Sequence, residues 1–245
     1  MRSAPVRILV VNPNSTESMT ASIGACARAV AGPGTLVEAV SPDGGPVSIE
    51  SHVEEALSVP GVLAQIAAGE RDGADAFVIA CFGDPGLLAA RELATGPVIG
   101  IAEAAMRSAA YLGRGFSVVT TLERTVGHTW DLARAYGLER HCLGVHATGI
   151  PVVELETDPV AYATVLGAAR AAMDTDGSDV IVLGCAGMAD LCARLQDDLG
   201  VPVVDGVAAA TVMARSLVEL GLTTSGRSEF APPKQAPVGQ GRGCH

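Results

Sequence analysis

Two stretches of the chain, residues 73–83 (GADAFVIACFG) and residues 177–187 (GSDVIVLGCAG), repeat one another and decide the fold. Five of the eleven aligned positions are identical, and they include Cys81 and Cys185, which lie 104 positions apart. The next strand repeats as well, because Pro97-Val98 aligns with Pro202-Val203. An internal repeat of this length, with an apolar run before each cysteine, predicts two similar α/β lobes.

Around the repeat, short β-branched runs alternate with longer stretches rich in alanine and leucine. This alternation predicts parallel sheets, and the continuous apolar character of the runs predicts burial on both faces. We expect strands at residues 8–11, 36–40, 76–80, 98–101, 116–120, 143–146, 180–184 and 201–204. We expect helices at residues 16–31, 53–71, 85–93, 104–112, 125–136, 159–174, 188–199 and 207–220.

The composition limits the class of protein. Hydrophobic residues form 49% of the chain and aromatic residues only 3%, which predicts a core of alanine, valine, leucine and isoleucine. The 27 acidic residues outnumber the 16 basic ones, so a nucleic-acid partner is excluded. No apolar run is long enough to cross a bilayer and no secretory signal is evident, so we expect a cytoplasmic protein without a membrane partner.

The six cysteines are expected to be free thiols, because the chain is long, rich in core residues and without secretory features. No CxxC motif is present, and His141-Cys142 with His146 lacks a second pair of metal ligands. We therefore expect no metal. The sequence also contains no motif for a nucleotide or phosphate cofactor, and we expect no cofactor.

Polar or reactive residues follow four of the predicted strands: Asn12–Asn14, Cys81, Thr120-Thr121 and Cys185. Ligands of parallel α/β sheets bind beyond the carboxyl ends of the strands, so two facing lobes would bring these residues to one cleft. Other interpretations exist for single residues. Asn14 is also placed to cap a helix in a capping box with Glu17, and cysteines at strand ends are commonly small core residues.

The chemistry follows from the two repeated cysteines. Each precedes a predicted helix, with Asp84-Pro85 expected to begin the helix after Cys81. The free N–H groups of a helix start favour a thiolate and bind an oxyanion. A free thiol has a pKa of about 8.5, so modest tuning would hold one thiolate near neutral pH. A thiolate and a thiol on opposite sides of a cleft would invert a stereocentre next to a carbonyl.

These motifs resemble the aspartate/glutamate/hydantoin racemase superfamily, over residues 7–222. The resemblance rests on residues 11–16 (VNPNST), 80–87 (ACFGDPGL) and 183–188 (LGCAGM), and with Ser48-Ile49-Glu50 it points to the hydantoin and allantoin racemase branch. Within that branch, residues 116–122 and 202–207 are most similar to allantoin racemases.

The resemblance implies a function and a site. It implies racemisation without a cofactor at C5 of a 5-substituted hydantoin, a small cyclic amide, with Cys81 and Cys185 as the acid/base pair. It also implies substrate contacts from Asn14, Ile49, Phe82, Gly83, Thr120, Thr121, Ala186 and Gly187. In such folds the last helix returns to the first lobe. The lobes are therefore expected at residues 1–104 plus 207–222 and at 105–206, with a flexible tail at 223–245.

Several alternatives remain open. A general hydantoin racemase would act on alkyl or aryl hydantoins, whereas a non-catalytic binding module would hold a cyclic amide without needing both thiols. Arylmalonate decarboxylases resemble a version of this site that has one cysteine. Maleate isomerases also resemble this arrangement, but in them one thiol acts as a nucleophile. The aliphatic composition is compatible with self-association, and we expect a homo-oligomer.

Overall fold

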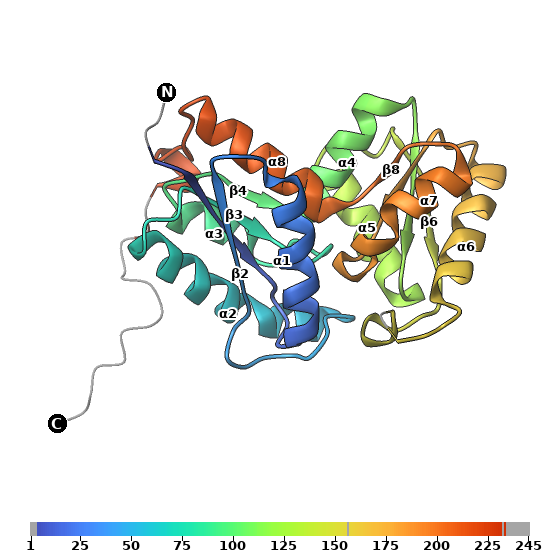
Figure 1. Cartoon of the computed structure of the whole chain (residues 1–245), viewed down its shortest axis with the longest axis horizontal. Coiled ribbons are helices and arrows are strands. Elements are labelled where there is room, and N and C mark those ends of the chain that lie inside the picture. Colours follow the sequence, from blue (N-terminus) through green and yellow to red (C-terminus); the bar gives the residue numbers. More distant parts are fainter. Residues whose placement is uncertain (1–3, 156, 232, 234–245) are drawn as a thin grey trace.

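Eight strands form two separate parallel sheets that lie side by side in the computed structural model, which describes residues 4–155, 157–231 and 233 (Figure 1). The first sheet has the order β2 (Thr35–Val40), β1 (Val6–Val11), β3 (Ala76–Ile79), β4 (Val98–Gly100). The second has the order β6 (Cys142–Ala147), β5 (Phe116–Thr120), β7 (Val180–Leu183), β8 (Val203–Val204). The predicted α/β class with two similar lobes is confirmed.

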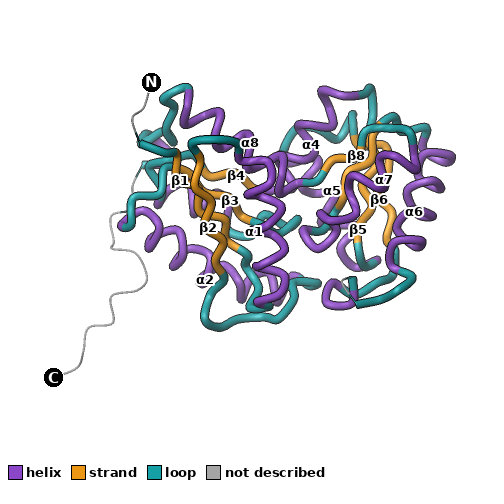
Figure 2. Tube along the Cα trace, in the orientation of Figure 1, coloured by secondary structure: helices purple, strands orange, loops and turns teal. Residues whose placement is uncertain are grey.

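Helices cover both faces of each sheet, as the apolar strands require (Figure 2). On the first sheet, one face carries α1 (Glu17–Ala31) and α8 (Gly206–Glu219), and the other carries α2 (His52–Arg71) and α3 (Leu87–Leu93). On the second sheet, one face carries α6 (Ala161–Asp176) and α7 (Cys192–Leu199), and the other carries α4 (Ile101–Leu112) and α5 (Glu123–Ala135).

The lobes exchange their last helices. Helix α4 follows the last strand of the first sheet but packs on β5 and β7 of the second, while α8 follows the second sheet and packs on β1 and β3 of the first. The two helices contact one another where they cross between the lobes (Figure 1). A side chain on Gly206 would come within 2.6 Å of the Ile101 carbonyl oxygen at this crossing, so only glycine fits. The boundary expected after residue 104 falls inside α4.

The core consists of small aliphatic side chains, as the composition predicts. One buried cluster runs between the lobes, from Ile8 and Val10 in β1 to Ile181 and Leu183 in β7. One further cluster fills the α2/α3 side of the first sheet and another the α4/α5 side of the second, and Phe77 and Phe116 are the aromatic residues buried in the strands. Small side chains allow helices to approach the sheets closely, so an aromatic-poor chain still packs densely.

The helices that follow the two cysteines differ from the expectation. Helix α3 begins at Leu87 rather than Pro85, because Gly86 is in the left-handed conformation with φ of 70°. The segment expected as a helix at 188–199 divides into a 3-10 helix, η2 (Ala186–Leu191), and then α7. The 3-10 turns therefore begin directly after Cys185.

The stretch after α8 contacts the first lobe. Thr224 donates hydrogen bonds from its N–H to the Thr95 carbonyl at 2.9 Å and from its hydroxyl to the Gly96 carbonyl at 2.7 Å. A short 3-10 helix, η3 (Ser228–Phe230), lies against α3. Most of the tail expected at 223–245 lies outside the described residues. Within the described part of the chain, every helix is too short or too polar to cross a membrane.

Candidate active site

The site lies where the strand order of each sheet reverses. In the order β2-β1-β3-β4, the connections from β1 and β3 leave in opposite directions, and a crevice opens beyond the carboxyl ends of these two strands. Asn14 follows β1 and Cys81 follows β3 at this crevice. The second sheet has the same topology, so Thr121 follows β5 and Cys185 follows β7 at the equivalent places.

Cys81 and Cys185 occupy matching positions, each two residues beyond its strand. Cys185 precedes η2 as its N-cap, and its sulfur accepts a hydrogen bond from the Gly187 N–H at 3.4 Å. The sulfur of Cys81 accepts from the Gly83 N–H in the same way. These backbone donors favour the thiolate form, as expected from the sequence.

Burial nevertheless dominates the acidity of both thiols. It raises the pKa of Cys81 to about 12 and the pKa of Cys185 to about 11, although the backbone N–H groups pull in the opposite direction. Repulsion from Cys185 further raises the pKa of Cys81, so the two sulfurs lie within electrostatic reach of each other. Desolvation of the charged sulfur therefore outweighs the helix start at both cysteines, and it opposes the expected thiolate near neutral pH.

Asn14 holds the turn after β1 rather than the start of α1. Its side-chain oxygen accepts from the Thr16 N–H at 3.0 Å and from the Asn12 amide at 2.9 Å. The N-cap of α1 is Thr16, which makes no side-chain cap bond, so the capping box expected with Glu17 does not form. Asn14 is 5% exposed and lines the cavity, and its amide nitrogen donates to the sulfur of Met19, another lining residue, at 3.2 Å.

Thr120 and Thr121 complete the equivalent turn in the second lobe. The Thr120 hydroxyl lies 3.0 Å from the Thr125 hydroxyl, and it donates to the Gly184 carbonyl at 3.4 Å. The Thr121 carbonyl accepts from the Gly149 N–H at 2.7 Å. Both threonines are buried at the cavity wall.

Asp84 anchors the loop that carries Cys81. Its carboxylate accepts from the N–H groups of Ala102 at 3.0 Å and Glu103 at 2.9 Å, so it caps α4 and not the helix that follows it. The Tyr136 hydroxyl also donates to it, at 2.6 Å. Burial raises the pKa of Asp84 to about 6, and these three donors oppose that rise. A side chain on Gly100 would lie 2.2 Å from the Asp84 carboxyl carbon, so this contact requires glycine.

One cavity of about 220 Å³ joins these elements. Nine of the ten predicted site residues line it: Asn14, Ile49, Cys81, Phe82, Gly83, Thr120, Thr121, Cys185 and Ala186. The tenth, Gly187, lies behind the wall, where its N–H reaches the Cys185 sulfur. Glu50 closes one side by accepting a hydrogen bond from the Val152 N–H at 2.8 Å, which links the lobes beside the cavity.

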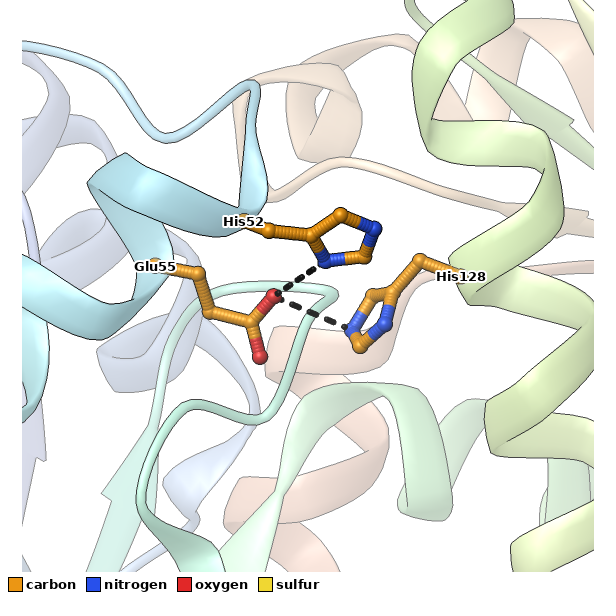
Figure 3. A group of neighbouring side chains, drawn as sticks. All are labelled: His52, Glu55 and His128. Atoms are coloured by element: carbon orange, nitrogen blue, oxygen red, sulfur yellow. Dashed lines mark ion pairs between the residues drawn. The ribbon is translucent and has the colours of Figure 1, made fainter.

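The polar lining residues that were not predicted as site residues include His52, Glu55 and His128. His52 and Glu55 lie in the first turn of α2, and His128, expected to be an ordinary histidine, lies in α5 (Figure 3). The His128 Nε2 lies 3.3 Å from the Gly83 carbonyl, next to the Cys81 loop. A His-x-x-Glu spacing at a helix start was the available sequence feature, but it is common on exposed helices.

The other described cysteines lie away from the cavity. Cys26 donates to the Asp205 carboxylate at 3.2 Å, and that carboxylate caps α8 by accepting from the Ala208 N–H. Cys192 donates to the Val203 carbonyl at 3.2 Å, and Cys142 is buried in the core of the second lobe. These cysteines and the two at the cavity are free thiols.

Comparison with known proteins identifies the family. The family model for Asp/Glu/hydantoin racemases matches residues 8–214. The chain belongs to this family. The hydantoin racemase of Rhizobium meliloti is 51% identical over 94% of this chain and 95% of its own length. The structure of an allantoin racemase from Klebsiella pneumoniae superposes with a TM-score of 0.93 at 52% identity, covering 96% of this chain and 97% of that chain. An allantoin racemase from Pseudomonas fluorescens gives a TM-score of 0.91 at 43% identity, with coverages of 95% and 99%.

The protein is therefore an isomerase of the racemase class that acts on a small molecule. The family resemblance seen in the cysteine motifs is confirmed, as is the two-lobed fold of the racemase.

Proposed function

We propose that this racemase inverts C5 of allantoin, a hydantoin that carries a ureido group, with Cys81 and Cys185 as its two bases. The placement of both thiols at equivalent strand ends of two facing lobes carries the proposal. A racemase without a leaving group needs one base and one acid on opposite faces of the stereocentre. Two like residues related by the repeat provide that arrangement for either enantiomer.

The proposed reaction transfers two protons and breaks no other bond. The thiolate on one side takes the C5 proton, and the electron pair of the C–H bond moves into the ring as an enolate. The opposite thiol then gives its proton to the other face of C5 and is left as the thiolate. The products are the inverted substrate and an enzyme with its thiol and thiolate exchanged, and no cofactor enters the scheme.

The enolate oxygen needs donors that are in place before the reaction. The backbone beside the two cysteines, at Phe82-Gly83 and Ala186-Gly187, offers N–H groups near both sulfurs. We assign the remaining substrate contacts to Asn14, Ile49, Thr120 and Thr121, which line the same cavity.

The polar cavity mouth supports allantoin as the substrate. The ureido group has N–H donors and a carbonyl acceptor, and it would meet the Glu55 carboxylate and the Arg124 guanidinium, both of which line the cavity. Two solved relatives that superpose over nearly the whole chain are named allantoin racemases.

A second candidate is a general hydantoin racemase. The Rhizobium meliloti relative carries that name, and part of the cavity wall is apolar, with Met19, Ile49, Phe82 and Val152. These side chains would suit an alkyl or aryl substituent at C5.

Assays in D2O separate the candidates. Purified protein is added to one enantiomer of allantoin, and in parallel to enantiopure 5-benzylhydantoin and 5-isopropylhydantoin. Optical rotation and deuterium at C5 are followed and corrected for spontaneous racemisation. We expect the fastest loss of rotation with allantoin, whereas faster reaction of the benzyl or isopropyl compound would support the second candidate. Absence of exchange on all three would contradict both.

A further inference from the structure

Three metal-ligating side chains from the two lobes meet at the mouth of the cavity. His52 and Glu55 come from the first turn of α2, and His128 comes from α5 in the other lobe (Figure 3). The Glu55 Oε2 atom lies 3.8 Å from the His52 Nδ1 atom and 3.5 Å from the His128 Nε2 atom. All three ligand atoms lie within 4.8 Å of one another.

We propose that His52, Glu55 and His128 form a binding site for a divalent transition-metal ion, with Zn²⁺ as the best fit. Two imidazoles and one carboxylate are a common ligand set for zinc sites that keep an open position. Zinc–ligand bonds of about 2.0–2.2 Å place the ligand atoms of a tetrahedral site about 3.4 Å apart. The two distances to Glu55 are close to this spacing, so small side-chain rotations complete the site.

The surroundings favour a cation at this point. The carboxylate of Glu55 is shared between the two imidazoles, whose rings meet edge to face with centroids 5.7 Å apart. The positive end of the α2 dipole opposes a cation, but Glu54 and Glu55 in the first turn offset it. The cavity wall also carries the carboxylate of Glu50 and the guanidinium of Arg124, which interacts with the Glu54 carboxylate.

The metal would enter from solvent and keep a free coordination position. The His52 side chain is 79% exposed, and the side chains of Glu55 and His128 are 24% and 23% exposed. Because all three residues line the cavity, the fourth ligand would be water or a molecule bound there. On metal binding, His128 would exchange its contact with the Gly83 carbonyl for a bond to the metal.

The site would also join the lobes. Its ligands come from α2, which packs on the first sheet, and from α5, which packs on the second. An ion held by both helices binds only the arrangement in which the lobes face each other, so it should stabilise the folded chain by mass action.

Metal titration of the Cys81→Ser/Cys185→Ser double variant tests the proposal without the cavity thiols and without reading activity. Co²⁺ reports its ligands through visible d–d bands, and Zn²⁺ is titrated by calorimetry. We expect one ion per chain, and a melting temperature raised by roughly 5 °C at a hundredfold excess over Kd. Adding His52→Gln, Glu55→Gln or His128→Gln should weaken binding at least tenfold and remove the thermal shift.

His141→Gln is the matched control, because His141 does not line the cavity and the described hydrogen bond of its side chain joins Nδ1 to the Arg114 carbonyl. It should bind as tightly as the double variant. Undiminished binding in both His52→Gln and His128→Gln would overturn the proposal, as would the absence of binding in the double variant. Neither result depends on racemase activity, so the proposed reaction would stand or fall separately.

Discussion

Desolvation favours the neutral form of Cys81 and Cys185, because burial raises the pKa of each thiol more than its backbone donor lowers it. In the proposed reaction, turnover would depend on the small fraction of molecules in which one of the two thiols has lost its proton. The residues next to the sulfurs, rather than a dedicated base, decide how large that fraction is.

Replacing either thiol should stop the reaction. We expect Cys81→Ser and Cys185→Ser each to reduce racemisation of allantoin by at least a hundredfold, because a serine hydroxyl is a far weaker acid than a thiol. One variant is expected to retain deuterium exchange on a single enantiomer, seen by NMR at C5. Cys192→Ser, away from the cavity, is the control and should keep normal activity. Normal racemisation by both cavity variants would rule out the two-thiol reaction.

The raised thiol pKa values predict the pH dependence of the rate. With values of about 11 and 12, the thiolate fraction grows tenfold for each pH unit below that range. We expect kcat/KM, which reports the free enzyme, to rise about tenfold per unit between about pH 7 and pH 9. A stopped polarimetric assay with subtraction of the spontaneous rate measures it. A flat profile over this interval would mean that a thiolate already exists at neutral pH.

At the scale of the elements, the loop after β3 is positioned by another helix. Asp84 has a φ of 46°, unusual for a residue with a side chain, and its carboxylate caps α4 instead of α3. Tyr136, just after α5, reaches the same carboxylate, so the Cys81 loop, α4 and α5 are tied together. The position of one cysteine thus depends on helices that pack on the other sheet.

Removing the Tyr136 hydroxyl tests how much its hydrogen bond to Asp84 stabilises the protein. Tyr136→Phe should lower the free energy of unfolding by about 1.5–3 kcal/mol at pH 7, because a hydrogen bond to a charged acceptor is lost in a buried place. Urea unfolding measures the change. Tyr111→Phe, with a side chain that is 83% exposed, should leave stability unchanged. Equal effects of the two substitutions would show that Asp84 does not depend on Tyr136.

Replacing two glycines inside helices by alanine should change the stability of the protein in opposite directions. Gly167 in α6 is exposed and has no atom near the place of a side chain, so Gly167→Ala should stabilise the protein by about 0.5–1 kcal/mol. In α2, a side chain on Gly69 would lie 2.6 Å from Leu9 and 2.8 Å from Phe77, so Gly69→Ala should destabilise it by about 1–3 kcal/mol. Thermal unfolding measures the melting temperature of both variants. A change of the same sign in the two would contradict the packing described for α2.

Desolvation acts on every cysteine thiol in the part of the molecule that the structure describes. Burial is the largest cause of a raised pKa for Cys26, Cys81, Cys142, Cys185 and Cys192. In the unfolded chain these groups lose their protons at lower pH than in the folded one. The folded state therefore binds more protons in alkaline solution, and stability must fall as pH rises.

The decrease of stability with rising pH can be measured. The contribution of the thiols to stability is fully present below about pH 8.5, the pKa of a free thiol, and is lost as pH rises toward about 11 to 12. We expect the free energy of unfolding, measured with urea under reducing conditions, to decrease between pH 8 and pH 10 by more than in the Cys81→Ser/Cys185→Ser double variant. Identical slopes for the two proteins would contradict the raised pKa values of the cavity thiols.

The sequence alone determined the repeat, the α/β class and the elements of both lobes, because apolar strands and the glycine-flanked cysteines are local patterns. The predicted strand ends also located most of the predicted residues of the cavity wall, since the carboxyl ends of parallel strands lie at one edge of the sheet.

Only the tertiary structure decided which helix covers which sheet, because α4 and α8 cross between lobes through contacts far apart in the chain. It also decided the acidity of the thiols, since desolvation depends on every atom packed around the sulfur in space and not only on the residues adjacent in the sequence. The meeting of His52, Glu55 and His128 has the same origin: α2 and α5 become neighbours at the cavity mouth only when the two lobes face each other.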